Sequence, residues 1–209
     1  MSKTLALTGW AFDKSSFSDS DNKLLIIDST KFLFNTQERW LEELKGIVLE
    51  NSIETIIGFS MGAIMSLKLL EESNFKRVTL LAPTFSFISR GGGCGVSKLS
   101  LNLMIKAIKR FPKRVLKEFY KNCGVSNRVD SNYSIDELVN GLEFLRETYI
   151  SPQNIGRETQ LHLVHGESDK IINLECGQEV ANTLNGDIEI VSGGHISALN
   201  HFNCSNYNL

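Results

Sequence analysis

The 209-residue sequence has no uninterrupted apolar run as long as a membrane span, which needs about 18 residues. Its apolar N-terminal run is short and soon reaches Asp13, which is unlike a signal peptide. A hydrophobic content of 42% and a charged content of 22% are those of a soluble globular protein. We therefore expect one cytoplasmic domain.

Cysteines are few, and their spacing is not that of a metal site. The four cysteines form no CxxC pair, so we expect free thiols in a reducing compartment. Cys94 lies in a glycine-rich stretch over 91–95, where a small loop residue is a better interpretation than a reactive thiol. Neither a His/Cys/Asp/Glu cluster with ligand spacing nor a strand followed by GxGxxG is found. We expect no metal and no other cofactor.

Short apolar runs alternate with helical patterns along most of the chain, which is typical of an α/β fold. The runs are continuous rather than alternating, as in parallel strands that are buried on both faces. They predict strands over 5–8, 24–27, 53–57, 78–81, 161–164 and 188–191. Helices are predicted over 40–48, with Thr36 as N-cap, and over 63–72 and 174–184. Together these elements predict an α/β fold: a mostly parallel sheet of about six strands with helices on both faces.

The alternation stops between residues 84 and 150, where only loop and helical patterns occur. A long connection between two strands of one sheet is usually functional. We therefore predict a helical cap over 84–150, inserted into a core formed by 1–83 and 151–209.

The pentapeptide Gly58-Phe59-Ser60-Met61-Gly62 fits G-x-S-x-G, the nucleophile elbow of serine hydrolases. In this turn the serine lies between a strand and a helix, so that its hydroxyl projects above the sheet edge. The flanking glycines leave room for the neighbouring backbone. A predicted strand precedes Ser60 and a predicted helix follows it, which is the context that the motif requires.

An acid and a base follow Ser60 in the expected order. Asp169 comes just after one predicted strand and His195 just after the next. Because the carboxyl ends of parallel strands share one sheet edge, the three side chains can meet there. We predict a triad in which His195 removes the Ser60 proton and Asp169 orients and stabilises the imidazole.

Other histidines and acids fit these roles less well. His162 lies within a strand, and His201 near the chain end, so both are interpreted as packing or surface residues. His165 ends its strand, where it can line the site, but it precedes the acid. Glu167 and Glu175 are alternatives to Asp169 with poorer spacing.

An acyl-transfer site also needs hydrogen-bond donors for the developing oxyanion. The residue after the nucleophile normally supplies one backbone N–H, which here is that of Met61. We assign the second donor to the N–H of Trp10, in the loop after the first predicted strand. Packing over the sheet edge is an alternative role for Trp10, and the two are compatible.

Taken together, these residues resemble the α/β-hydrolase superfamily over nearly the whole chain. Its members commonly carry His-Gly-Trp or His-Gly-Gly at the oxyanion loop, whereas this sequence has Thr8-Gly9-Trp10. The departure removes a histidine that usually braces the loop, although the donor itself is backbone. The two antiparallel strands that usually come first are also missing from the pattern, which starts with the run over 5–8.

A narrower resemblance is to the biotin-pathway esterases that demethylate pimeloyl-acyl-carrier-protein methyl ester. It rests on Gly9-Trp10, on the strand exit over 82–87 (APTFSF), on the segment over 141–145 (GLEFL) and on the compact helical cap. It implies an acyl ester substrate that is delivered by an acidic carrier protein.

The cap is strongly basic, although the formal net charge of the chain is only −2. Residues 86–128 hold ten Lys/Arg and one acid, Glu118. At 100° per residue, seven cations over 102–121 fall within an arc of about 140°, opposite Ile105, Ile108, Phe111, Val115 and Phe119. The cations are Lys106, Lys109, Arg110, Lys113, Arg114, Lys117 and Lys121. Pro112 divides the arc between two helices.

A solvated helix face would explain an ordinary charge run, but so many like charges repel one another unless an anionic partner offsets them. Acyl carrier protein fits that description. Nucleic acid is a rival partner, disfavoured by the triad and by the acidic remainder of the chain. An anionic membrane surface is a third alternative.

We therefore expect a monomeric serine carboxylesterase that acts on an acyl ester, with Phe85, Phe87 and Met104 as pocket walls in addition to Trp10. Core packing is the alternative role for Phe85, Phe87 and Met104. A short-chain carboxylesterase and an acyl thioesterase are alternatives on the same scaffold, because both reactions pass through an acyl-enzyme. A catalytically silent binding module belongs to a different class, but it would lack a triad member, and none is missing.

Overall fold

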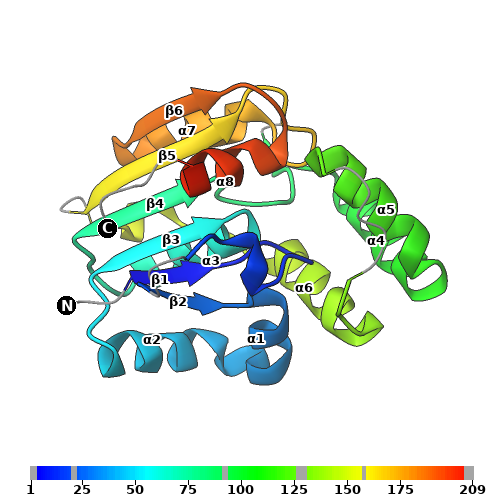
Figure 1. The fold of residues 1–209 in the computed structure, drawn as a ribbon, viewed down its shortest axis with the longest axis horizontal. Helices are drawn as coiled ribbons and strands as arrows, with labels where there is room; N and C mark the ends of the chain where they lie inside the picture. Colours follow the sequence, from blue (N-terminus) through cyan, green and yellow to red (C-terminus); the bar gives the residue numbers. More distant parts are fainter. Residues whose placement is uncertain (1–3, 20–22, 91–93, 126–130, 157–158, 205–209) are drawn as a thin grey trace.

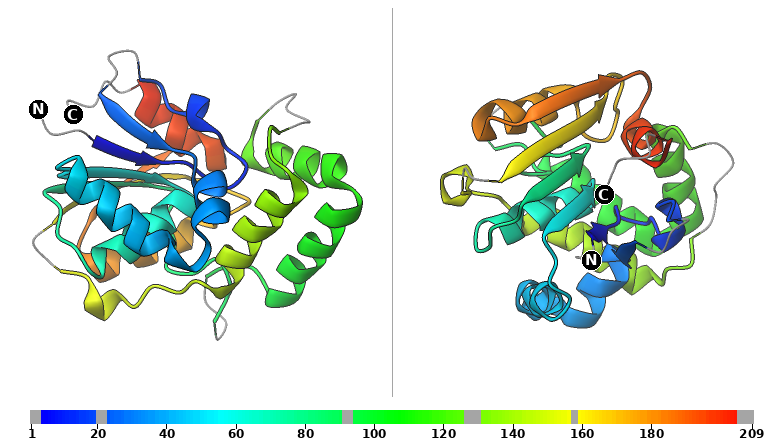
Figure 2. Two further views of the ribbon diagram at one scale, coloured as in Figure 1. Left: turned by 90° about the horizontal axis from the view of Figure 1, so that it is seen from below. Right: turned by 60° about the vertical axis from the view of Figure 1, so that its left-hand side comes forward.

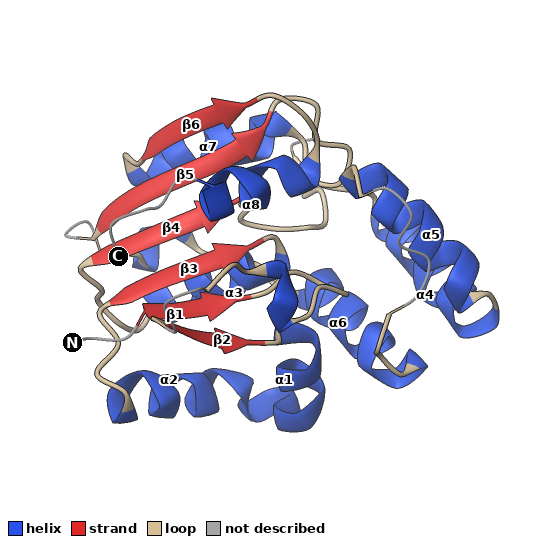
Figure 3. Cartoon of the chain, viewed as in Figure 1, coloured by secondary structure: helices blue, strands red, loops and turns tan. Residues whose placement is uncertain are grey.

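The computed structural model describes residues 4–19, 23–90, 94–125, 131–156 and 159–204. One six-stranded sheet has the order β2-β1-β3-β4-β5-β6, and every neighbouring pair in it is parallel (Figures 1 and 3). The strands are β1 (Thr4–Leu7), β2 (Leu24–Ile27), β3 (Thr55–Phe59), β4 (Arg77–Leu81), β5 (Gln160–Gly166) and β6 (Asp187–Val191). The predicted six-stranded α/β architecture is confirmed.

The central strands are buried on both faces, as their continuous apolar runs predicted. Ile56 and Ile57 are successive residues of β3 that point to opposite faces, and both are fully buried. The edge strand β2 is only partly buried along its length. The core of the molecule therefore lies on the two faces of β1, β3, β4 and β5.

Helices cover both faces of the sheet. In Figure 1, α8 (His195–Cys204) lies in front of the sheet, and α3 (Met61–Leu70) and α7 (Leu174–Leu184) lie behind it. The turned views of Figure 2 agree with this arrangement. Two further helices, α1 (Ser29–Thr36) and α2 (Trp40–Glu50), connect β2 to β3.

The prediction that Thr36 caps the helix over 40–48 was wrong. Thr36 is the last residue of α1, and its hydroxyl donates a hydrogen bond of 2.7 Å to the Phe32 carbonyl. Helix α1 was not predicted, and it begins after Asp28, whose carboxylate accepts from the Lys31 amide. Eight residues span little more than two turns, which is too short for apolar periodicity to identify a helix.

Three helices from the segment over 84–150 lie together beyond the carboxyl ends of the strands (Figures 1 and 2). They are α4 (Lys98–Arg110), α5 (Pro112–Cys123) and α6 (Ile135–Glu147). Pro112 separates α4 from α5 by occupying the first position of α5, where its fixed φ and missing N–H are tolerated. Helix α6 packs on α1 and α4, and α5 contacts α8. Among the described helices, none combines the length and the apolar character needed to cross a membrane.

Candidate active site

Ser60 occupies a strained turn between β3 and α3. Strand β3 ends at Phe59 and α3 begins at Met61, so Ser60 alone makes the connection. Its φ of 56° and ψ of −111° are rarely adopted by a residue with a side chain, and such a conformation costs about 1–3 kcal/mol. Its amide donates to the Leu81 carbonyl of β4 at 2.8 Å. The elbow expected from the motif is therefore formed at the carboxyl end of a central strand.

Both glycines of the motif lie where a side chain would collide with backbone. A Cβ on Gly62 would lie 2.2 Å from the Leu7 carbonyl oxygen of β1. One on Gly58 would lie 2.4 Å from the Ser66 hydroxyl and 2.5 Å from the Gly62 carbonyl oxygen. These close approaches allow α3 to begin directly against β1 and β3, and so fix the position of Ser60.

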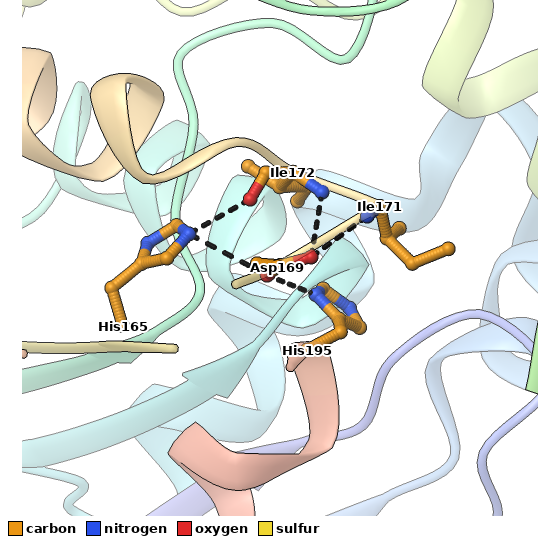
Figure 4. A network of polar contacts seen from close by, with 5 residues as sticks. All are labelled: His165, Asp169, Ile171, Ile172 and His195. Atoms are coloured by element: carbon orange, nitrogen blue, oxygen red, sulfur yellow. Dashed lines mark hydrogen bonds and ion pairs between the residues drawn. The ribbon is translucent and has the colours of Figure 1, made fainter. Parts of the chain in front are cut away.

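Asp169 and His195 meet at the same edge of the sheet. Asp169 lies in the turn after β5, where its amide donates to the Gly166 carbonyl, and His195 is the first residue of α8. The His195 Nδ1 and the Asp169 Oδ2 are 2.7 Å apart, and both side chains are fully buried. The structure thus brings Asp169 and His195 into contact, as the chain order predicted (Figure 4).

The Asp169 carboxylate is surrounded by donors. Its Oδ1 accepts from the amides of Ile171 at 2.8 Å and Ile172 at 3.0 Å. Burial by itself raises the pKa of Asp169, but the His195 charge and the hydrogen bonds from His165, His195 and Ile172 outweigh it, so that the pKa lies well below its usual range. Asp169 therefore stays ionised.

His195 presents its other nitrogen unpaired. Its Nε2 is buried and has no hydrogen-bond partner within the part of the chain that the structure describes. The imidazole lies against the Phe59 ring with centroids 5.0 Å apart, and Phe59 directly precedes Ser60. With Asp169 on Nδ1, the Nε2 is the atom left to take a proton from a neighbouring group.

The Gly9-Trp10 loop is braced by hydroxyl groups rather than by a histidine. The Thr8 hydroxyl accepts from the Ser29 amide at 3.0 Å, and the Thr30 hydroxyl accepts from the Ala11 amide at 3.1 Å. The Tyr120 hydroxyl, from the cap helix α5, donates to the Ala11 carbonyl at 2.7 Å. These braces could not be predicted from the sequence, because they join segments that are far apart in the chain.

Trp10 lies beneath the cap, as expected for a residue over the sheet edge. Its indole N–H donates to the Leu138 carbonyl of α6 at 2.9 Å, and its ring meets the Phe119 ring edge-on at 4.7 Å. A Cβ on Gly141 would lie 2.6 Å from the indole ring. In the described ranges, the backbone amides of Trp10 and Met61 donate to no carbonyl, so both remain available as donors.

A mostly apolar cavity of about 160 Å³ lies between this sheet edge and the cap. Ser60 and Trp10 line it, together with the predicted walls Phe87 and Met104. The other lining residues are Val96, Ser100, Leu101, Phe119, Leu142, Leu145, Lys170 and Ile171. Ser60 is 8% exposed, so the elbow is largely enclosed.

Phe85 is not placed in this cavity. It is buried and lines a separate one, whereas Phe87 lines the cavity of Ser60. The Thr84 hydroxyl donates to the Ser86 carbonyl, and the Ser86 hydroxyl to the Ile88 carbonyl. These local hydrogen bonds bend the segment away from an extended strand, so the two phenylalanines do not share a face. The prediction that Phe85 is a pocket wall was therefore wrong.

The rival titratable residues lie elsewhere, with one exception. Glu167 and Glu175 are exposed, and the imidazoles of His162 and His201 both approach Glu189, at 3.8 and 3.0 Å. His165 is the exception, because it is fully buried and its Nε2 lies 3.5 Å from the Asp169 Oδ2.

The thiol of Cys94 is not activated. Burial, followed by contacts with Cys176 and Glu179, raises its pKa to about 12, whereas a reactive cysteine needs a lowered pKa. No group of three or more possible metal ligands occurs among the described residues.

The cations of α4 and α5 lie on the exposed side of the cap. Lys106, Lys109, Arg110, Lys113, Arg114, Lys117 and Lys121 are all exposed. The buried positions of α5 are Leu116, Tyr120 and Cys123, so the expected apolar arc was only partly right. Phe111 is 60% exposed, because it stands at the break between the two helices.

No family model and no curated protein sequence matches the chain. Solved structures do match. An esterase from Exiguobacterium antarcticum is 18% identical, with a TM-score of 0.75 over 92% of this chain and 85% of its own. An enol-lactonase from Burkholderia xenovorans is 12% identical, with a TM-score of 0.73 over 98% and 88%. An α/β-hydrolase enzyme from a deep-sea metagenome is 16% identical, with a TM-score of 0.65 over 94% and 83%.

These matches extend over more than nine-tenths of the chain and show that it has the α/β-hydrolase fold. At such low identity they concern the fold alone, because one scaffold carries many unrelated reactions. The reaction therefore depends on the residues of the site.

Proposed function

We propose that this protein is a serine carboxylesterase with Ser60 as nucleophile, His195 as base and Asp169 as acid. The observation that carries the proposal is the buried His195, which is bonded to Asp169 through Nδ1 and has no partner at Nε2 among the described residues. Its ring packs on Phe59, the residue before the elbow serine that lines the cavity. A histidine that is held in this way can accept a proton at one nitrogen only.

In the proposed reaction the Ser60 Oγ attacks the ester carbonyl while His195 Nε2 takes the hydroxyl proton. The amides of Met61 and Trp10 donate to the resulting oxyanion, and each such donor contributes on the order of 10²–10³ in rate. His195 then returns the proton to the leaving alcohol. Water activated by His195 releases the acid from Ser60 in a second, equivalent cycle.

The surroundings of Ser60 favour a linear acyl group as substrate. A second cavity, of about 440 Å³, shares Met104, Phe119 and Ile171 with the cavity of Ser60. It continues between α4 and α5, where Phe111, Arg114 and Asn122 line it. An extended chain with its ester at Ser60 would pass these three shared residues and leave the cap beside the exposed cations.

Carrier-protein delivery accounts for the basic cap. Arg114, one of the exposed cations of α4 and α5, lines the outer cavity. The single acid of the segment, Glu118, lines it as well and lies 3.9 Å from Lys121. An acidic carrier protein docked there would place its prosthetic arm at the outer cavity. We therefore name pimeloyl-acyl-carrier-protein methyl ester, with methanol as the leaving alcohol, as the substrate.

The test compares matched substrates on the purified protein. We expect a fluorophosphonate probe to label the wild type but not Ser60→Ala. We also expect the pimeloyl methyl ester to be cleaved with a higher kcat/KM on the carrier protein than as a free ester. Rescue of a biotin auxotroph that lacks this esterase activity, again with Ser60→Ala as control, tests the physiological assignment.

Three other outcomes would contradict different parts of the proposal: the carrier protein, the ester bond or the enzymatic activity itself. Labelling with equal cleavage of free and carrier-bound esters would indicate a general short-chain carboxylesterase. Faster cleavage of the carrier thioester than of the methyl ester would indicate a thioesterase. Absence of labelling would indicate a binding module without esterase chemistry.

A further inference from the structure

Two histidines reach the same carboxylate from different sides (Figure 4). His195 Nδ1 lies 2.7 Å from the Asp169 Oδ2, and His165 Nε2 lies 3.5 Å from the same oxygen. His165 Nε2 also lies 2.8 Å from the Ile172 carbonyl oxygen. His165 is the penultimate residue of β5 and is fully buried.

The partners of His165 determine its tautomer. A carbonyl oxygen only accepts, so the proton shared with Ile172 must be on His165 Nε2. The Nδ1 is buried and has no hydrogen-bond partner among the described residues, and a proton there would be an unsatisfied buried donor. His165 is therefore a neutral donor whose one N–H is shared with the Ile172 carbonyl, while the Asp169 Oδ2 lies 3.5 Å from the same nitrogen.

These contacts close a ring around the turn after β5. The Ile172 amide donates to Asp169 Oδ1 at 3.0 Å, while its carbonyl accepts from His165. His165 thus holds the turn to the strand that precedes it. The same turn carries Ile171, which lines both the cavity of Ser60 and the outer cavity.

Helix α7 fixes the His165 ring from the opposite side. A Cβ on Gly177 would lie 2.3 Å from His165 Nδ1, so only glycine lets α7 pass at this distance. The backbone of α7 therefore packs directly against the edge of the His165 ring that carries Nδ1. The turn after β5 lies on the other side, at Nε2.

We propose that His165 is a positioning residue: its neutral Nε2–H holds Asp169 and the turn at residues 169–172, and so sets the alignment of His195 with Ser60. This inference rests on the proposed function for its catalytic consequence, but not for the contact itself. His165 touches neither the cavity nor the reacting atoms and acts through Asp169.

The test compares His165→Gln, which retains a side-chain N–H donor, with His165→Met, which retains volume but has no donor. We expect His165→Met to lower kcat on the order of 10- to 100-fold, as for removal of other groups that orient a functional residue, with KM changed less than about threefold. His165→Gln should recover most of the lost kcat.

A spectroscopic measurement separates positioning from folding. The proton between His195 and Asp169 should give a downfield NMR resonance, measured in the Ser60→Ala background. We expect His165→Met to shift or broaden this resonance and His165→Gln to leave it close to its original position. Gly177→Ala, which pushes the ring from outside, should act like His165→Met.

Equal losses of kcat in the two His165 variants, or an unchanged resonance in His165→Met, would overturn the proposal. Lack of esterase activity in the wild type would instead contradict the proposed function. The resonance in the Ser60→Ala background would still decide the role of His165 in that case.

Discussion

Gly62 and Gly46 are two helical glycines with opposite surroundings. A Cβ on Gly62 would lie 2.2 Å from the Leu7 carbonyl oxygen, whereas one on Gly46 would find nothing within 4 Å. The first glycine is required by the contact between α3 and β1. The second only weakens α2, because glycine in a helix interior costs about 1 kcal/mol relative to alanine.

We therefore expect Gly62→Ala and Gly46→Ala to change stability in opposite directions. Gly62→Ala should lower the free energy of unfolding by about 3 kcal/mol, as overpacking against backbone does, and should displace Ser60. Gly46→Ala should raise it by roughly 0.5–1 kcal/mol. Urea denaturation of both variants measures the difference. A neutral Gly62→Ala would contradict the close approach of α3 and β1.

The helices α4 and α5 carry their cations toward solvent and their apolar side toward the core and the two cavities. Exposed apolar residues accompany the cations on this side of the cap, with Leu99 at 69%, Leu103 at 56% and Phe111 at 60% exposure. Like charges so close together repel one another and are retained at some cost in stability. The proposed carrier protein would meet both the cations and these apolar groups.

Neutralising Lys109, Arg110 and Lys113 to Gln should weaken carrier-protein docking. We expect the ratio of kcat/KM for carrier-bound to free methyl ester to fall about tenfold, mainly through KM, because rim charges act on association. Steady-state kinetics on both substrates measure this ratio. The dependence of kcat/KM on salt concentration should also become weaker for the carrier-bound ester.

Lys45→Gln and Lys76→Gln provide the matched control. These cations pair with Glu72 and Glu54, and Lys76 directly precedes β4, at the end of the sheet opposite the cap. If the control lowers the ratio as much as the cap variant does, general charge and not docking is responsible.

The pH dependence of stability is a property of the whole molecule. Two buried acids, Asp169 and Asp28, have pKa values shifted in opposite directions and therefore affect this dependence in opposite ways. The His195 charge and the surrounding hydrogen bonds overcome burial and hold the pKa of Asp169 below its usual range. Burial, partly offset by the Tyr133 hydrogen bond, raises the pKa of Asp28. A lowered carboxyl pKa stabilises the fold above the unfolded-state value, and a raised one stabilises it below that value.

Comparison with Asp169→Asn isolates the first of these effects. The stability that ionised Asp169 contributes is fully present above pH about 4 and is lost as the pH falls toward its folded-state pKa. We therefore expect the difference in unfolding free energy between wild type and Asp169→Asn to shrink by at least about 1 kcal/mol between pH 6 and pH 2. Denaturant unfolding across this range checks it. A difference that is constant with pH would contradict the lowered pKa.

Much of the fold could be predicted because its signals are local. The strands are contiguous apolar runs, and the elbow requires a strand, two glycines and a helix within a few residues of Ser60. Asp169 and His195 could be predicted because parallel strands direct their carboxyl ends to one edge. Helix α1 could not be predicted, since its eight residues hold too few turns for periodicity.

By itself, the sequence determined the order of strands and helices along the chain, the elbow at Ser60 and the residues that can complete a triad. Only the tertiary structure decided that Phe87 and not Phe85 lines the cavity of Ser60, that the hydroxyls of Thr8, Thr30 and Tyr120 brace the Gly9-Trp10 loop, and that His165 reaches Asp169. These contacts depend on side-chain directions and on segments separated by many residues. Neither the side-chain directions nor the long-range contacts follow from local spacing, because both are determined by the packing of the cap and of α7 on the sheet.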